Sequence, residues 1–182
     1  MTTRPTHTVT VAGLERHLPL FEVAPGVTIA IFNLLGDTYV TKAAAAALAE
    51  KVAPLGGDVL VTPEAKSITL AYEMSALLGL PYVVLRKSHK PYMGDTINAE
   101  TVSITTGKPQ TLHLDEKDIP LVKGKKVILV DDVVSTGSTL KGMEAVINAA
   151  QGNIHAITAV FTEGDADWSH VIALGNLPVF TS

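Results

Sequence analysis

The chain has 182 residues, 47% hydrophobic and 18% charged, which excludes disordered and fibrous proteins and gives one domain enough residues for a sizeable core. The formal net charge is -4 and Lys and Arg are scattered, so a nucleic-acid binding surface is disfavoured. The chain has no cysteine, which excludes disulfides and thiolate chemistry, and no signal peptide or membrane span, so we expect a single cytoplasmic domain over residues 1–182.

From the N-terminus, about thirty residues through VTIAIFN form strand-like segments with no helical pattern between them. After them, short β-branched runs alternate with helical patterns. We expect strands at residues 58–62, 82–86, 127–132 and 155–161, and helices at residues 41–53, 67–79 and 138–150. This alternation predicts a doubly wound, mostly parallel α/β sheet flanked by helices.

Two further segments fit this arrangement. In the last helix, Leu140, Met143, Ile147 and Ala150 fall on one face, which would lie on the sheet. The segment ETVSITTGKPQTLHL, residues 100–114, has strand-like ends around a glycine and a proline, so we interpret it as a β-hairpin or a long loop.

The residues with the clearest chemistry lie in KKVILVDDVVSTGST, residues 125–139. Asp131 and Asp132 fall where a strand ends, and ligands of open α/β sheets bind beyond the carboxyl ends of strands. The turn that follows leads into a helix, so backbone N–H groups and the helix dipole point at one spot that suits a phosphate. The turn consists of Ser135, Thr136, Gly137, Ser138 and Thr139. Because carboxylates accept hydrogen bonds from hydroxyl groups, the combination indicates a sugar phosphate.

Other interpretations of this stretch are helix capping and the common nucleotide and phosphatase motifs. Capping of the helix by Asp132 and Ser135 remains an alternative, whereas the motifs do not match. The chain has neither a G-x-x-x-x-G-K-[ST] loop nor a G-x-G-x-x-G motif after a strand. A phosphatase-type D-x-D is also missing, because Val133 stands where its second aspartate would be.

VILVDDVVSTGST resembles the phosphoribosyl pyrophosphate (PRPP) signature of type I phosphoribosyltransferases, except that Ser138 stands where the family usually has glycine. The resemblance implies the fold of that family, with a small hood from about residues 1–37 and the C-terminal residues. It also implies a flexible β-hairpin flap at about residues 89–112. In this family pattern Asp131 and Asp132 would orient the ribose hydroxyls and favour developing positive charge, and the turn after them would hold the 5'-phosphate.

The resemblance extends to DVLVTPEAKSITLAYEMSALLGLPYVVLRKSHK, which is similar to the adenine and xanthine branch. It implies that Glu64, Ala65 and Lys66 form a loop that binds pyrophosphate through backbone N–H groups. It also implies that Arg86 and Lys87 reach the pyrophosphate oxygens, a role that suits cations at a strand end. The alternative for Arg86 and Lys87 is solvated charge at a strand terminus.

The base-binding residues are implied by weaker matches. IAIFNLLGD is similar to the xanthine branch, which makes Phe32 and Asn33 candidates for base contacts, together with Glu163. A core aromatic and a turn asparagine are the alternatives for Phe32 and Asn33. Gly164 stands where the xanthine branch has a lysine that serves the base. We interpret Trp168 as packing at the edge of the sheet rather than as a base-stacking residue.

The flap sequence bears on the choice between adenine and xanthine. Adenine enzymes usually carry E-Y-G in the flap, whereas this chain has SITTGKPQ, with Thr105 and Thr106 near that place. This segment is more similar to the xanthine enzymes and to the purine repressor that shares their fold. The missing lysine at Gly164 favours adenine over an oxidised base, and the missing E-Y-G argues against adenine.

The resemblance thus implies a purine-salvage enzyme, a homodimer, that transfers phosphoribosyl from PRPP to a purine base, adenine favoured, and releases pyrophosphate. The six histidines lack metal-binding spacing, so Mg²⁺ would be carried by PRPP and not by the protein alone. The alternatives are a xanthine-type enzyme, an enzyme for orotate, and a PRPP-sensing regulator related to the purine repressor. The segment before Asp58 looks too short and too acidic for the DNA-binding domain of that repressor.

Overall fold

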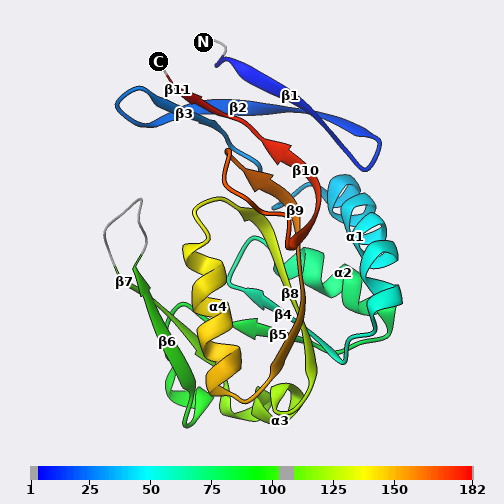
Figure 1. Ribbon diagram of the computed structural model, residues 1–182, viewed down its shortest axis with the longest axis vertical. Helices are drawn as coiled ribbons and strands as arrows, with labels where there is room; N and C mark the ends of the chain where they lie inside the picture. Colours follow the sequence, from blue (N-terminus) through cyan, green and yellow to red (C-terminus); the bar gives the residue numbers. More distant parts are fainter. Residues whose placement is uncertain (1–3, 103–108, 182) are drawn as a thin grey trace.

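A five-stranded sheet forms the centre of the protein in the computed structural model, which describes residues 4–102 and 109–181 (Figure 1). In spatial order its strands are β10 (Val171–Leu177), β9 (Asn153–Glu163), β8 (Lys126–Val134), β4 (Val59–Pro63) and β5 (Tyr82–Leu85). Every neighbouring pair runs parallel. The doubly wound α/β sheet predicted from the alternation is confirmed, and β10 is a further strand that the sequence pattern did not reveal.

Helices cover both faces of this sheet (Figure 1). The longer ones are α1 (Thr38–Val52), α2 (Ile68–Leu78) and α4 (Ser138–Ala149). The shorter ones are α3 (Ile119–Val122) and the 3₁₀ turns η1 (Ala53–Leu55), η2 (Pro91–Met93) and η3 (Glu116–Asp118). Helix α1 begins three residues earlier than predicted because the side chain of Asp37 caps it, accepting a hydrogen bond from the backbone N–H of Val40 at 3.1 Å.

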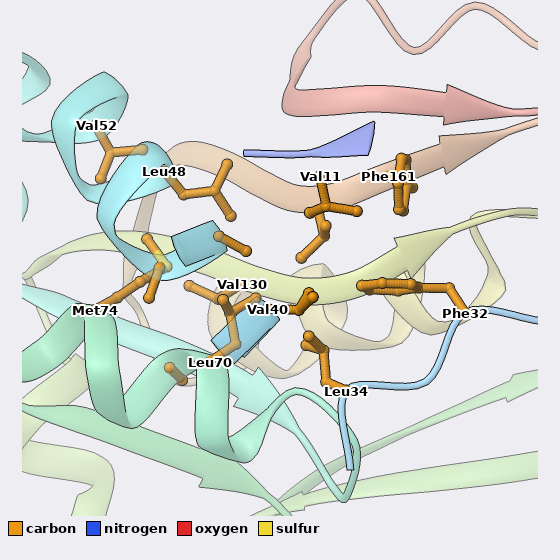
Figure 2. Packing of buried hydrophobic residues seen from close by; sticks show 14 of the residues in the cluster. Val11, Phe32, Leu34, Val40, Leu48, Val52, Leu70, Met74, Val130 and Phe161 are labelled. Atoms are coloured by element: carbon orange, nitrogen blue, oxygen red, sulfur yellow. The ribbon is translucent and has the colours of Figure 1, made fainter. Parts of the chain in front are cut away.

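The central strand β8 joins two hydrophobic clusters, one on each face of the sheet. Ile128 and Val130 pack with Leu48 of α1 and the neighbouring residues of α2 (Figure 2). Val127 and Leu129 pack with the buried residues of α4. Successive residues of a strand point to opposite faces, so one apolar run serves both clusters and fixes β8 in the middle of the sheet.

A second sheet lies beyond the carboxyl ends of the central strands (Figure 1). Its four antiparallel strands are, in order, β1 (Thr6–Val11), β2 (Leu14–Ala24), β3 (Val27–Ala30) and β11 (Val179–Thr181). The guanidinium group of Arg16 on β2 binds both carboxylate oxygens of Asp37, at 2.6 and 3.1 Å. This bidentate ion pair connects the second sheet to the start of α1.

The predicted hairpin is formed by β6 (Ile97–Val102) and β7 (Pro109–Leu114), which pair antiparallel. Leu112 and Leu114 of β7 are buried in the cluster that contains α4. Thr105 and Thr106 of the predicted flap lie outside the described residues. Among the described helices, none has both the length and the apolar character needed to cross a membrane.

Candidate active site

Asp131 and Asp132 lie near the carboxyl end of β8, which continues to Val134, two residues beyond the strand predicted from the sequence. One carboxylate oxygen of Asp131, Oδ1, accepts hydrogen bonds from the backbone N–H of Asp132 at 2.8 Å and from the hydroxyl of Ser67 at 3.3 Å. Burial, and next the charge of Asp132, raise the pKa of Asp131 to about 8. The neutral form of the Asp131 carboxyl group is therefore favoured more strongly than in an exposed aspartate.

Asp132 is buried, with 9% of its surface exposed. Its Oδ2 atom has no hydrogen-bond donor among the described residues, and the ammonium group of Lys66 is 3.9 Å away. A buried carboxylate oxygen normally has a donor, so this atom is suited to accept a hydrogen bond from a bound hydroxyl group.

Gly137 gives the turn after β8 its shape. Its backbone is left-handed, with φ of +74°, and a Cβ atom at this position would lie 2.7 Å from Cη2 of Trp168. Both the backbone conformation and the lack of space require glycine. Trp168 packs against the hydrophobic cluster of α4, in agreement with a packing role rather than base stacking.

The N-terminus of α4 has no side-chain cap, so the interpretation of Asp132 and Ser135 as helix caps is wrong. Its backbone N–H groups border a small hollow of about 80 Å³. The hollow is lined by residues 133–140 and Asp131. Apart from a 3.4 Å hydrogen bond from the Ser138 N–H to Oγ1 of Thr136, the N–H groups at the start of this twelve-residue helix have no side-chain cap, so they are suited to bind an anion.

The hydroxyl group of Ser135 is already engaged. It donates a 2.5 Å hydrogen bond to Oε2 of Glu163, which lies at the end of the neighbouring strand β9 and is 8% exposed. A serine hydroxyl has one hydrogen, so Ser135 cannot donate to a phosphate and to Glu163 at the same time. In this arrangement only the backbone N–H of Ser135 can donate a hydrogen bond to a phosphate.

The largest collection of predicted site residues lines one cavity of about 320 Å³. It is bordered by Ile29, Ala30, Ile31, Phe32, Lys66, Gln110, Asp132, Val133, Ser135, Thr136, Ser138, Thr139 and Glu163. The second sheet, the loop before α2, the turn before α4, the end of β9 and the base of the hairpin all contribute to it. A volume of this size falls in the range of small-molecule sites.

The two predicted hood residues differ in position. Phe32 lines the cavity, but it is only 5% exposed and its ring packs edge-to-face on Phe161 with centroids 5.0 Å apart (Figure 2). Asn33 does not line the cavity, and its side-chain oxygen accepts a hydrogen bond from the backbone N–H of Leu35 at 3.1 Å. Gly164 faces a different hollow, so Glu163 is the residue that β9 contributes to the cavity.

The predicted pyrophosphate residues are divided between two places. Lys66 lines the 320 Å³ cavity. Glu64 Oε2 accepts a 2.9 Å hydrogen bond from the backbone N–H of Lys87 and lies 3.2 Å from Nε of Arg86. These contacts, the Lys87 N–H first, lower the pKa of Glu64. Arg86 lines a separate cavity of about 520 Å³ beside Tyr92, and the structure does not bring it to the cavity that contains Asp132.

Sequence reasoning missed three polar residues near the site. Thr62 and Ser67 are fully buried, and a hydrogen bond of 2.9 Å joins their hydroxyl groups next to Asp131. The only signal for them was a hydroxyl residue at the end of an apolar strand and another before a helix. Gln110, on β7, lines the cavity from the hairpin, and only the folded arrangement reveals this.

A family model and the sequences of known proteins both match this chain, and they indicate the same family. Residues 37–173 match the model of the phosphoribosyl transferase domain. The adenine phosphoribosyltransferase of Thermosipho africanus is 32% identical over 130 residues, which are 70% of this chain and 72% of that protein. The purine biosynthesis transcriptional repressor PurR of Bacillus subtilis is 28% identical over 135 residues, 74% of this chain. These residues are 47% of the repressor, so the chain spans about half of its length.

Solved structures show the same fold. The crystal structure of adenine phosphoribosyltransferase from Thermoanaerobacter pseudethanolicus superposes with a TM-score of 0.69, covering 94% of this chain and 95% of that one at 19% identity. The family model covers most of the chain and includes the carboxylate pair, the phosphate turn and the loop before α2. The chain therefore belongs to the phosphoribosyltransferase family.

Proposed function

We propose that the protein is a purine phosphoribosyltransferase, which transfers the 5-phosphoribosyl group of PRPP to a purine base, with adenine favoured, and releases pyrophosphate. One observation carries this proposal. A single cavity is bordered by a carboxylate with an oxygen that lacks a donor, by a lysine, and by a turn that leads into an uncapped helix. These are the groups needed for hydroxyls, for pyrophosphate and for a terminal phosphate.

In this proposal the donor is bound at three points. The N–H groups at the start of α4 and the hydroxyls of Ser138 and Thr139 hold the 5'-phosphate, and the Thr136 hydroxyl donates to Oγ of Ser138 at 3.2 Å. Asp132 and the ionised form of Asp131 accept hydrogen bonds from the ribose hydroxyls. Lys66 and the backbone of the loop from Glu64 hold the pyrophosphate. Most of the rate enhancement would come from positioning, since the three points fix the reacting carbon relative to the base.

A purine ring nitrogen forms the new bond to the anomeric carbon of the ribose while the bond from that carbon to pyrophosphate breaks. The bonding electrons leave with the pyrophosphate, and the attacking nitrogen loses its proton. Positive charge develops on the ribose ring during this exchange. In this proposal Asp132, a buried carboxylate at the border of the cavity, stabilises this charge.

The preference for adenine rests on Glu163. Its carboxylate lines the cavity at the position next to Gly164, where a lysine would favour an oxidised and readily ionised base. A carboxylate accepts hydrogen bonds and therefore suits the exocyclic amino group of adenine. A xanthine-type enzyme is the alternative within this class, because the flap sequence lacks E-Y-G.

Mg²⁺ is expected to enter as part of the donor. Among the described residues, no group of three or more His, Cys, Asp or Glu side chains could hold a metal ion. The oxygens of pyrophosphate and ribose are the ligands that this hard cation prefers, and the ion would neutralise charge on the leaving group. A cytoplasmic location and a homodimer complete the proposal.

A second candidate function is favoured by one observation. The relatives of this chain include the PurR repressor of Bacillus subtilis and the purine biosynthesis transcriptional activator PurR of Lactococcus lactis, which is 25% identical over 142 residues. A PRPP-sensing regulator would use the same carboxylates and phosphate turn to bind PRPP, without turnover of a base.

The two candidates are separated by one assay. Purified protein is incubated with PRPP, Mg²⁺ and each of adenine, hypoxanthine, guanine, xanthine and orotate, and pyrophosphate release is measured beside PRPP binding by calorimetry. Nucleotide formation from a purine, fastest with adenine, supports the enzyme. PRPP binding without turnover of any base supports the regulator, and turnover of orotate alone overturns the purine class.

A further inference from the structure

A chain of buried hydroxyl groups connects the loop before α2 to the carboxylate pair. Thr62, in β4, and Ser67, directly before α2, are 0% and 1% exposed. The hydroxyl of Thr62 donates to Oγ of Ser67 at 2.9 Å. The hydroxyl of Ser67 lies 3.3 Å from Oδ1 of Asp131 and also 3.3 Å from the backbone carbonyl oxygen of Pro63. The two acceptors are therefore equally close to one donor.

Ser67 does not serve as a helix cap. Serine before a helix usually caps the first turn, but the side chain of Ser67 makes no cap hydrogen bond to α2. Its hydroxyl is buried beside Asp131 of β8, where it receives one hydrogen bond from Thr62 and has one hydrogen to donate. That hydrogen goes either to Asp131 or to Pro63.

We propose that Ser67 is a positioning residue whose hydroxyl group stabilises the ionised form of Asp131 and couples the carboxylate to the loop of Glu64, Ala65 and Lys66. When Asp131 is ionised, the Ser67 hydrogen points to its Oδ1 atom. When Asp131 is neutral, the same hydrogen returns to the carbonyl oxygen of Pro63, directly before the loop. The Ser67 hydrogen is thus donated either to Asp131, at the ribose end of the site, or to Pro63, at the pyrophosphate end.

The surroundings of Asp131 agree with this role. Asp132 is its neighbour on β8 and disfavours a second negative charge, and the ammonium group of Lys66 is 3.9 Å from Asp132 rather than paired with Asp131. On β9 the residue opposite Asp131 is Ala159, and Glu163 lies further along that strand. Burial and Asp132 raise the pKa of Asp131, whereas the hydrogen bonds from the Asp132 N–H and from Ser67 lower it.

The tests use variants chosen to keep the fold intact. Ser67→Ala alone would leave the buried Thr62 hydroxyl without its acceptor, so the informative variant is Thr62→Val combined with Ser67→Ala, which removes both partners at similar volume. Thr62→Val alone is the matched control, because it keeps the bond from Ser67 to Asp131. Each variant is also made in an Asp131→Asn background, where no carboxylate can titrate.

The first measurement is the melting temperature of the ligand-free protein between pH 6 and pH 9, which does not depend on the proposed function. Loss of the Ser67 hydroxyl should raise the pKa of Asp131. The melting temperature of the double variant should therefore fall further below that of the Thr62→Val control as the pH increases. In the Asp131→Asn background the difference should be the same at every pH. A pH-independent difference with Asp131 present would overturn the proposal.

The second measurement rests on the proposed function. The double variant should lose about tenfold in kcat/KM for PRPP at pH 7, and the acidic limb of its pH profile should move up by about half a unit to one unit. Thr62→Val should stay within about threefold of the wild type, as expected for a residue one step removed. An unmoved acidic limb would contradict the coupling. If the wild type neither binds PRPP nor turns over a base, the proposed function fails, and the melting temperatures still decide the role of Ser67.

Discussion

Replacement of Gly137 by alanine should damage both the fold and the phosphate turn. Two costs add at this position. A left-handed backbone costs a residue with a side chain about 1–2 kcal/mol, and the new Cβ atom would lie 2.7 Å from Cη2 and 3.4 Å from Cζ3 of Trp168. Overpacking of this kind costs about 1–3 kcal/mol. At about 2–4 °C per kcal/mol for a chain of this length, the melting temperature should fall on the order of 10 °C.

Gly124 provides the matched control. It has a similar left-handed backbone, with φ of +72°, but a Cβ atom there would meet nothing within 4 Å. Gly124→Ala should therefore show the backbone cost alone, and the difference between the two variants measures the overlap with Trp168. Scanning calorimetry gives both values, and titration with PRPP and Mg²⁺ should show weaker binding only for Gly137→Ala.

A third variant tests the cause of the difference. Phenylalanine lacks the outer ring atoms of tryptophan, so in a Trp168→Phe background Gly137→Ala should cost little more than Gly124→Ala. Equal destabilisation by the two glycine substitutions in the wild-type background would refute the reasoning. An unchanged cost of Gly137→Ala after Trp168→Phe would also refute it, because the overlap would then not be with Trp168.

Three other substitutions follow from the contacts of the site. Asp131→Asn should become more stable relative to the wild type as the pH rises from about 5 to 8. The raised pKa of Asp131 means that the folded wild type binds a proton that the unfolded chain releases, so the wild type loses up to about 1.4 kcal/mol of stability per pH unit there. Glu50→Gln, at an exposed position of α1, is the control and should show no such trend in calorimetry. Asp37→Ala should cost about 1–2 kcal/mol through loss of the cap and of the partly exposed ion pair, and Asp37→Asn less. Glu163→Gln should raise the KM for adenine about tenfold and leave that for PRPP nearly unchanged, and equal effects on both would contradict a base contact.

The central sheet and the phosphate turn could be predicted because their signals are local. The run from Val127 is continuously apolar and mostly β-branched, as is typical of a strand buried on both faces, and the small residues around Gly137 indicate a tight turn. Strand β10 escaped prediction because Gly175 and Asn176 interrupt its apolar pattern. Its place in the sheet depends on pairing with β9 and not on its own sequence.

Contacts between distant residues could not be predicted from the sequence. Ser135 and Glu163 meet because β8 and β9 are neighbours and end at the same edge of the sheet. The sequence assigned the Ser135 hydroxyl to a phosphate, and nothing near Ser135 in the chain indicates that a carboxylate 28 residues away accepts its hydrogen. The overlap of Trp168 with Gly137 depends in the same way on the path of the chain after β9.

Arg86 shows how the same limit affects the assignment of a binding residue. The motif identifies a cation at the end of β5, but it does not say which anion holds that cation before a ligand arrives. In the structure the partner is Glu64, 3.2 Å from Nε. For Arg86 to bind pyrophosphate through its Nε–H, the guanidinium group would exchange one carboxylate for a ligand with several negative charges, which is the stronger partner. Glu64 would keep its 2.9 Å hydrogen bond from the backbone N–H of Lys87, so the exchange would not leave that carboxylate without a donor.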